Sequence, residues 1–275
     1  MLTGISTRAR VPDSTDTPPI SKGFRRAMAS SFSLMPRLRQ ITSACPWCLQ
    51  TCAALVFARD AWHIAPQRRQ AERPPMTTAL HDARLRAVCA AVRDTGARTL
   101  LDLGCGAGDL ILRLARLPDL SRLTGIDIDL ASLRAAQARL ADLPPEARAK
   151  VQLAQASMTA AHPNLRGYDC ACLVETIEHL PLGDLNRLEH ALFADMRPGH
   201  VIVTTPNAEF NPVLGVPAHR FRHPGHHFEW DRARFAGWAE GVAARHGYTV
   251  TRHDIGETHP ALGGASQMAV FARLG

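Results

Sequence analysis

The stretch DCACLVETIEHL, residues 169–180, joins an apolar run to two carboxylates and an imidazole. Five of the six residues from Asp169 to Val174 are apolar and turn-forming residues precede them, which predicts a buried strand of a parallel sheet. Glu175 then stands at the carboxyl end of this strand. Ligands of open α/β sheets bind at the carboxyl ends of the strands, so the stretch predicts both the centre of the sheet and the edge that carries the site.

The charged residues of this stretch have the spacing of a metal site. If the chain turns helical at Glu175, then Glu175, Glu178 and His179 lie at positions i, i+3 and i+4 and point to one side of the first turn. Two facing carboxylates repel each other, and a divalent cation is the simplest group that holds them together. The alternative is that Glu178 and His179 only cap and solvate the start of a helix, and ExxEH alone does not separate the two interpretations.

A glycine-rich turn precedes this stretch along the chain. LLDLGCGAGD, residues 100–109, places Gly104 and Gly106 between a predicted strand, Arg98–Leu103, and an amphipathic helix, so that the backbone can approach a ligand closely. About 20 residues later, GIDID ends the next predicted strand, and Asp127 stands where an acidic side chain accepts hydrogen bonds from a ribose diol. Together the two segments predict an adenosine-binding βαβ unit.

The turn GCGAG, with Asp102 inside the preceding LLDL, resembles that of the class I methyltransferases that use S-adenosyl-L-methionine, rather than the GxGxxG turn of dinucleotide-binding proteins. The resemblance covers residues 98–273 and implies a seven-stranded, mostly parallel, Rossmann-like α/β sheet with helices on both faces. QASM, residues 155–158, follows the third predicted strand, where that class contacts the adenine, so Ser157 is a candidate contact as well as an ordinary loop serine. The further predicted elements are helices at 130–143, 185–195 and 232–246 and strands at 123–128, 151–153, 201–204, 248–253 and 267–272.

Residues 1–75 differ in composition from the rest of the chain. They hold 11 Lys and Arg against 4 Asp and Glu, whereas residues 76–275 hold 21 of each, so the formal charge of +7 belongs to the first segment. Its Ser, Thr, Pro and Arg content without periodicity is typical of a disordered arm, although its early part also resembles a transit peptide and translation could begin at Met76. We therefore expect a methyltransferase domain at 76–275, and the net charge alone does not indicate a nucleic-acid partner.

Cysteine usage predicts a reduced, cytoplasmic protein. The four cysteines after residue 75 fall in predicted helix, turn and strand, where they are expected to be buried apolar residues. The CPWCLQTC cluster at 45–52 lacks a second pair of Cys or His at metal-binding spacing and is interpreted as non-functional. The apolar run at 48–58 is too short to span a bilayer, so we expect no membrane association.

A long loop follows the fifth predicted strand. The segment from Thr204 to Phe235 begins with TTPNAEFNPVLGVP, which has too many Pro, Asn and Gly residues for regular structure. Long loops in compact domains are usually functional. Its run HRFRHPGHHFEW, residues 219–230, holds four histidines, two arginines and three aromatic residues directly before a helix. Such a composition can bind a metal ion, phosphate and bases.

Three blocks resemble the RNA 3′-terminal ribose 2′-O-methyltransferases of the HUA-enhancer type, a family of small-RNA methyltransferases and bacterial RNA-repair enzymes. The blocks are LLDLGCGAGD with GIDID, ETIEHL, and TTPNAEFN followed by FRHPGHHFEW. The resemblance implies that a divalent metal is held by the residues Glu175, Glu178, His179 and His226. Gly225 departs from the family, which commonly has an acidic residue there, and this affects the orientation of His226.

The resemblance also implies a mechanism. A metal that binds the 2′ and 3′ hydroxyls of an RNA 3′ end would orient the 2′ oxygen and lower its pKa for attack on the methyl group. Because two ligands are imidazoles, Mn²⁺ is expected to support activity better than Mg²⁺. The alternatives are a small-molecule O-methyltransferase and a non-catalytic RNA-binding protein. A partner in RNA repair, such as a kinase or ligase, would be a separate polypeptide.

Overall fold

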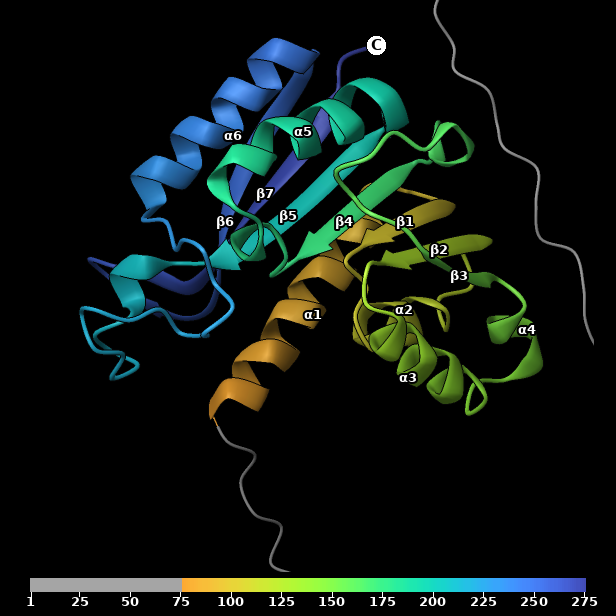
Figure 1. Ribbon diagram of the computed structural model, residues 1–275, viewed down its shortest axis with the longest axis horizontal. Helices are drawn as coiled ribbons and strands as arrows, with labels where there is room; N and C mark the ends of the chain where they lie inside the picture. The colour runs from red at the N-terminus through yellow and green to blue at the C-terminus, as the bar shows by residue number, and fades with distance from the viewer. Residues whose placement is uncertain (1–75) are drawn as a thin grey trace, which may run out of the picture. The chain divides into compact units, whose positions relative to one another are not determined.

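The computed structural model describes residues 76–275, and the predictions for the arm and its cysteine cluster lie outside this part of the chain. The described residues form one seven-stranded sheet in the order β3-β2-β1-β4-β5-β7-β6, in which β7 is antiparallel to both neighbours and the other pairs are parallel (Figure 1). This confirms the predicted fold class. The strands are β1 (Thr99–Leu103), β2 (Arg122–Asp127), β3 (Val151–Gln155), β4 (Cys170–Val174), β5 (His200–Pro206), β6 (Tyr248–His259) and β7 (Gly263–Arg273).

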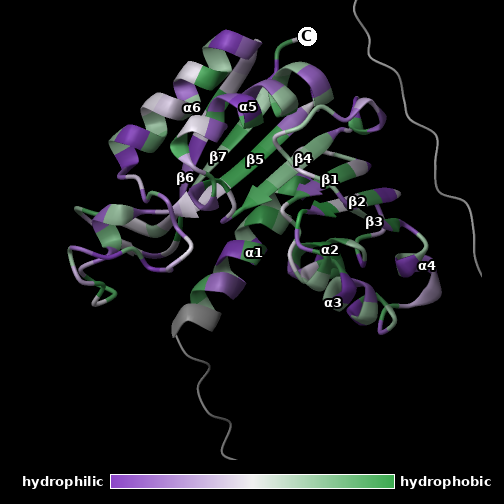
Figure 2. Ribbon diagram, in the orientation of Figure 1, coloured by the Kyte–Doolittle hydropathy of each residue, from purple (hydrophilic) through white to green (hydrophobic). Residues whose placement is uncertain are grey.

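Helices cover both faces of the sheet. Successive residues of a strand point to opposite faces. Leu100 of β1 accordingly packs in a core with α1 and α2, whereas Leu101 and Leu103 pack in a second core with α5 and α6. Figure 2 shows the apolar central strands between helices in which polar and apolar residues alternate. The helices are α1 (Met76–Asp94), α2 (Asp109–Leu114), α3 (Leu130–Leu140), α4 (Pro145–Arg148), α5 (Leu185–Glu189) and α6 (Arg232–His246), with short turns η1 (Pro163–Leu165), η2 (Ile177–His179), η3 (Leu182–Asp184), η4 (His190–Met196) and η5 (Ala208–Phe210).

Several elements differ in extent from their predictions. The helix predicted at 185–195 is α5 continued by the wider turn η4, a π-helix that ends at Arg197 with a left-handed φ of 48°. The hairpin of β6 and β7 is longer than predicted at 248–253 and 267–272. Most of β6 is exposed at the edge of the sheet, and Ile255 is the one buried apolar residue in its second half, residues 254–259, so this half lacks the apolar alternation that indicates a strand.

The order of the strands creates the site. The chain runs outward from β1 through β2 and β3, and then returns to place β4 on the other side of β1. In such a sheet the crevice lies where the direction reverses, between the carboxyl ends of these two central strands. Gly104 follows β1 there with φ 77°, and a Cβ at this position would lie 2.4 Å from Cγ2 of Thr176, which follows β4. Only glycine therefore permits the close approach of the two strand ends.

The prediction of a helix that begins at Glu175 is wrong. Glu175 has a left-handed φ of 52°, a conformation that costs about 1–2 kcal/mol for a residue with a Cβ. Its N–H donates to the carbonyl and to the hydroxyl of Thr204, at 3.1 Å each, which holds this strained turn. The single helical turn η2 starts two residues later. As a result Glu178 points into the protein, with no exposed surface, while His179 is exposed.

Candidate metal and cofactor site

A cavity of about 480 Å³ lies at the carboxyl ends of β1 to β4. Asp127 lines it at the end of β2, and its carboxylate accepts hydrogen bonds from the backbone N–H groups of Gly106 and Asp129, at 2.8 Å each. Gly104 lines the cavity from the glycine turn. Its other lining residues are Ile128, Ser132, Ala156, Ser157, Met158, Glu175, Thr176, His179 and Leu180.

The predicted cofactor residues therefore occupy different positions around this cavity. Gly104, Asp127 and Ser157 line it, and the hydroxyl of Ser157 also bonds to that of Thr159 at 2.9 Å. Gly106 is not among the lining residues, and its backbone N–H donates a hydrogen bond to the carboxylate of Asp127. Asp102 lies beneath the glycine turn, almost fully buried, and its Oδ2 has no hydrogen-bond partner. Burial, and then the charges of Asp127 and Asp109, raise the pKa of Asp102 to about 7.

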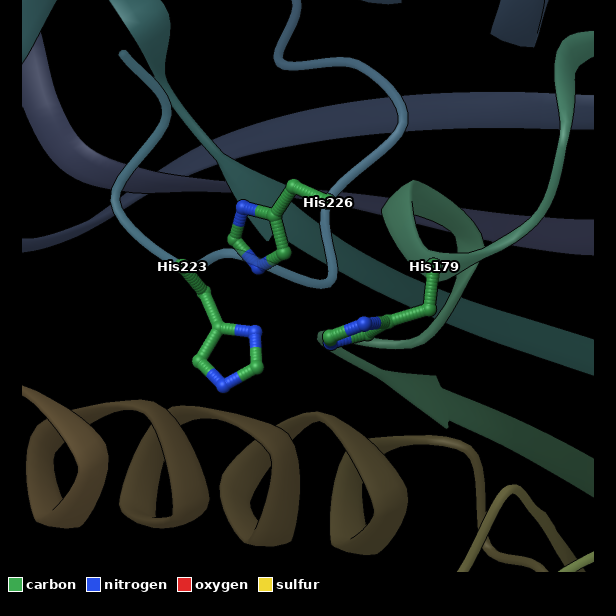
Figure 3. A group of neighbouring side chains, drawn as sticks. All are labelled: His179, His223 and His226. Carbon is green, nitrogen blue, oxygen red and sulfur yellow. The ribbon is translucent and has the colours of Figure 1, made fainter.

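Three histidines converge beside the cavity (Figure 3). His179 belongs to η2, whereas His223 and His226 come from the loop between β5 and α6. Their ligand atoms lie within 4.8 Å of one another, and within residues 76–275 this is the one group of His, Cys, Asp and Glu side chains at metal-binding spacing. The structure thus brings together His179 and His226, two of the four predicted ligands. It adds His223, which the family resemblance did not include.

Hydrogen bonds fix which nitrogen of each ring is available. Nδ1 of His179 lies 3.0 Å from the carbonyl oxygen of Gly225, and Nδ1 of His226 lies 2.6 Å from Oε1 of Glu229. Because these oxygens only accept, each Nδ1 carries the proton and each Nε2 presents the lone pair that a metal requires. In His223, Nδ1 instead accepts from the N–H of Gly225 at 3.0 Å, so its Nε2 is a donor when the ring is neutral. The pattern suits His179 and His226 as ligands.

The departure at Gly225 has a steric and a polar consequence. A Cβ at this position would lie 3.1 Å from Nδ1 of His223 and 3.3 Å from Nδ1 of His179, closer than an ordinary contact. The glycine therefore lets the two rings approach each other. The carboxylate that orients His226 comes instead from Glu229, which is buried, three residues along the chain.

Glu178 has the surroundings of a carboxylate that lacks a cation. Its Oε2 accepts from the hydroxyl of Thr205 at 3.0 Å, but its Oε1 is buried without any hydrogen-bond partner. Burial first, and then the charge of Glu175, raise the pKa of Glu178 well above its ordinary value. An unsatisfied buried acceptor costs about 1–3 kcal/mol, and more when it is charged. A metal ion beside Oε1 would remove that cost, so the surroundings of Glu178 suit a ligand, although Glu178 is not in the group that lies at metal-binding spacing.

Glu175 is held by a different partner. Its Oε2 lies 2.9 Å from Nη2 of Arg84 on α1, and its Oε1 accepts from the hydroxyl of Thr204 at 3.1 Å. Arg84 also donates to the hydroxyl of Ser266 on β7, at 3.1 Å through Nη2. Burial raises the pKa of Glu175, and the Arg84 charge opposes this effect. The arginine therefore supplies the positive charge that the carboxylate needs, and Glu175 does not join the three histidines at metal-binding spacing.

A second arginine ties the histidine loop to the sheet. Arg222 donates through its guanidinium to the carbonyl oxygens of Ala265 and Asn207 and to Oδ1 of Asn211. The loop also bonds to η2, because the N–H of His227 donates to the carbonyl of Glu178 at 2.8 Å. These contacts fix the histidines relative to the end of β4.

Reasoning from the sequence missed four residues that support the site: Arg84, His223, Arg222 and Glu229. Arg222, His223 and Glu229 lie inside the block FRHPGHHFEW, so the block was identified but their individual roles were not. The spacing of His226 and Glu229 is a local signal that could have indicated their hydrogen bond. Arg84 gave no signal, because it reaches Glu175 from a helix that is 91 positions away in the sequence.

Comparisons with known proteins identify the relatives of this chain. A family model described as "Methyltransferase domain" matches residues 100–199. A small RNA 2′-O-methyltransferase of Gallus gallus is 34% identical over 207 residues, which are 72% of this chain and 54% of that protein. The chain thus spans about half the length of the curated relatives it matches.

Two solved structures extend the comparison to three dimensions. The methyltransferase domain of bacterial CtHen1 superposes with a TM-score of 0.64 at 36% identity, and the match covers 70% of this chain and 99% of that domain. The small RNA methyltransferase HEN1 superposes with a TM-score of 0.66 at 30% identity, over 76% of this chain and 27% of that protein. The sequence, the fold and these matches lead to one conclusion: the chain belongs to the Hen1 family of small RNA 2′-O-methyltransferases, whose methyltransferase domain it contains.

Proposed function

We propose that the protein transfers a methyl group from S-adenosyl-L-methionine to the 2′-hydroxyl of the 3′-terminal ribose of RNA, with the help of a divalent metal. One observation carries the proposal. The cavity that Asp127 lines is also lined by Glu175 and by His179 of the histidine cluster, so the predicted cofactor site and this cluster border one cavity. A methyl donor and a hydroxyl held by the cluster would therefore meet.

Asp127 and the glycine turn form the cofactor side of the proposed site. The carboxylate of Asp127 keeps free lone pairs besides those bonded to Gly106 and Asp129, and it can accept from the ribose hydroxyls of the cofactor. Ser157 lies where the adenine is expected. Asp102, almost fully buried beneath the turn, offers an acceptor without a partner.

Glu178, His179 and His226 would hold the metal, and Glu175 would join them on release from Arg84. When bound, the cation supplies positive charge that favours the ionised form of a nearby hydroxyl and selects an end with two adjacent hydroxyls. The protein's own part is positioning. Glu229 and the Gly225 carbonyl keep the protons on Nδ1 of the two imidazoles. Burial lowers the pKa of His179, which keeps that ring neutral at pH 7.

The substrate, the metal and the partners remain proposals. RNA 3′ ends are proposed as the substrate because curated relatives are named small RNA 2′-O-methyltransferases. Mn²⁺ is proposed to support activity better than Mg²⁺ because two ligands are imidazoles. A separate repair kinase or ligase stays a prediction. Of the helices that the structure describes, none is long and apolar enough to cross a membrane.

Methyl transfer to a panel of RNA oligonucleotides, with catechol as a small-molecule acceptor, tests the proposal. Labelled S-adenosyl-L-methionine should mark RNA and leave catechol unmarked. Transfer to catechol alone would replace the proposal with the small-molecule alternative. Chelation with EDTA should stop the reaction and Mn²⁺ should restore it, whereas full activity in EDTA would remove the metal from the proposal.

A further inference from the structure

Exposed apolar side chains gather at one edge of the sheet. Among the side chains that the structure describes, five of the six large exposed ones follow the carboxyl ends of β2, β4 and β5, and one lies at the C-terminus. They are Ile128, Leu130, Leu182, Val213 and Phe221, with Leu274 as the exception. These five residues thus belong to segments that start at the edge with the cavity, and Ile128 lines the cavity itself.

Phe221 stands out in this set because its backbone is fixed while its side chain remains exposed. It is 46% exposed and lies two residues before His223 of the cluster. The next residue, Arg222, is anchored at both ends, since its N–H donates to Oε1 of Glu229 at 2.7 Å and its guanidinium donates to Ala265 at 2.6 Å. Because the neighbouring backbone is held, mainly the side-chain torsions of Phe221 would be ordered when a ligand stacks on its ring, which keeps the entropic cost small.

Hydrogen bonds also join the two ends of the loop between β5 and α6. Asn207 and Trp230 form an isolated parallel β-bridge, and the amide of Asn207 donates to the carbonyl oxygens of Leu262 and Gly264, at 2.8 and 2.9 Å. The loop thus leaves and re-enters the domain at one place (Figure 1, between β5 and α6). The ends of the loop that carries Phe221 are therefore fixed to the domain.

The charge around Phe221 favours a nucleic acid over a protein as the occupant of this surface. Residues 212–228 contain two arginines, four histidines and no acidic residue. Arg220, directly before Phe221 in the chain, is exposed, whereas the guanidinium of Arg222 donates to Asn207, Asn211 and Ala265. Aromatic rings interleaved with basic side chains bind single-stranded nucleic acids, because bases stack on the rings and phosphates face the cations. An apolar surface alone would not distinguish these partners.

We propose that Phe221 is the platform on which the base of the 3′-terminal nucleotide of single-stranded RNA stacks. This inference rests on the proposed function. Stacking at this position would place the terminal ribose next to His223 and its neighbours, and the exposed Arg220 would face the preceding phosphate. Since every base has a π face, the platform should accept all four terminal bases with similar affinity.

Kinetics and binding of Phe221→Ala, Phe221→Trp and the control Leu274→Ala test the inference. Removing a stacked base typically costs about 1–3 kcal/mol, so Phe221→Ala should raise the KM and the Kd for a short single-stranded RNA by about 5- to 150-fold. Phe221→Trp should stay close to wild type, and so should Leu274→Ala, which alters an exposed apolar residue away from the site. S-adenosylhomocysteine binding, measured by calorimetry, should be equal in all four proteins and reports that each is folded.

An RNA whose 3′-terminal nucleotide lacks its base tests whether Phe221 contacts that base. Wild type should bind this RNA as weakly as Phe221→Ala does, and the variant should bind it no worse than normal RNA. If wild type methylates RNA while the KM and Kd of Phe221→Ala are unchanged, the stacking inference fails and the proposed function stands. If wild type neither binds nor methylates RNA, both fail. A change from dimer to monomer on Phe221→Ala, seen by light scattering, would assign the ring to a second copy of the chain instead.

Discussion

Asp102→Asn should change how the stability of the protein depends on pH. Asp102 is almost fully buried beneath the glycine turn, and its pKa of about 7 in the folded protein compares with an ordinary value of 3.8. Because the folded pKa is the higher one, the carboxyl group favours folding at low pH and loses this contribution as the pH rises from about 4 to about 7. An asparagine has no proton to lose, so the variant lacks this pH dependence.

The magnitude follows from the two pKa values. Relative to a side chain that does not ionise, Asp102 lowers the free energy of unfolding of wild type by up to about 4 kcal/mol at pH 8 and by about 2 kcal/mol at pH 5. Burying the amide of asparagine without a partner adds a cost that does not depend on pH. The quantity to compare is therefore the change with pH. The free energy of unfolding of Asp102→Asn, minus that of wild type, should rise by about 2–3 kcal/mol between pH 5 and pH 8.

Urea denaturation of the full chain at several pH values measures this difference. Asp142→Asn is the matched control, because Asp142 is exposed and its substitution should give the same difference at every pH. A difference for Asp102→Asn that does not change between pH 5 and pH 8 would refute the raised pKa of the buried Asp102.

Three further variants test the site. Asp127→Ala should weaken S-adenosyl-L-methionine binding by roughly 1.5–3 kcal/mol, since it removes the charged acceptor for the ribose hydroxyls, and calorimetry that shows unchanged affinity would remove Asp127 from the cofactor site. Arg84→Met should lower the free energy of unfolding by about 3–5 kcal/mol, because it leaves the buried carboxylate of Glu175 without a cation. Added Mn²⁺ should stabilise this variant more than it stabilises wild type. Equal denaturation midpoints for the two proteins would count against the ion pair. Glu229→Gln should weaken Mn²⁺ binding by about 10- to 100-fold, because His226 loses the carboxylate that orients its ring. The control Glu209→Gln alters a partly exposed ion pair with Arg232 and should leave Mn²⁺ binding unchanged. Equal Mn²⁺ affinities for wild type and both variants would show that Glu229 does not orient the ligand.

Most of the fold could be predicted from the sequence, because the strands are apolar runs that end in turn residues. The run before Glu175 and the glycine turn after Leu103 fixed the two central strands and therefore the edge that holds the site. The second half of β6 was not predicted, since an exposed edge strand needs no apolar alternation. The order of the strands in the sheet was not predicted, because no local pattern encodes which strands pair.

The site was predicted in its residue types and less well in its local geometry. The spacing of ExxEH suggested a helix, but the left-handed conformation of Glu175 depends on hydrogen bonds from Thr204, which lies on a neighbouring strand. His223 joined His179 because Gly225 leaves room for both rings. Arg84 reaches Glu175 from α1, which is distant in the sequence. Such contacts are tertiary, and the spacing of residues along the chain does not reveal them.

The most direct test of the account uses one RNA sequence with three different 3′ ends. Initial rates of methyl transfer from labelled S-adenosyl-L-methionine are measured with Mn²⁺ for an end that has both hydroxyls, an end that lacks the 3′-hydroxyl, and an end that lacks the 2′-hydroxyl. The account predicts rapid methylation of the first end only, with a product that resists periodate because its 2′ oxygen is methylated. Equal rates on the first two ends, or a methyl group on any other atom, would contradict the proposal that a metal-assisted site selects the terminal diol.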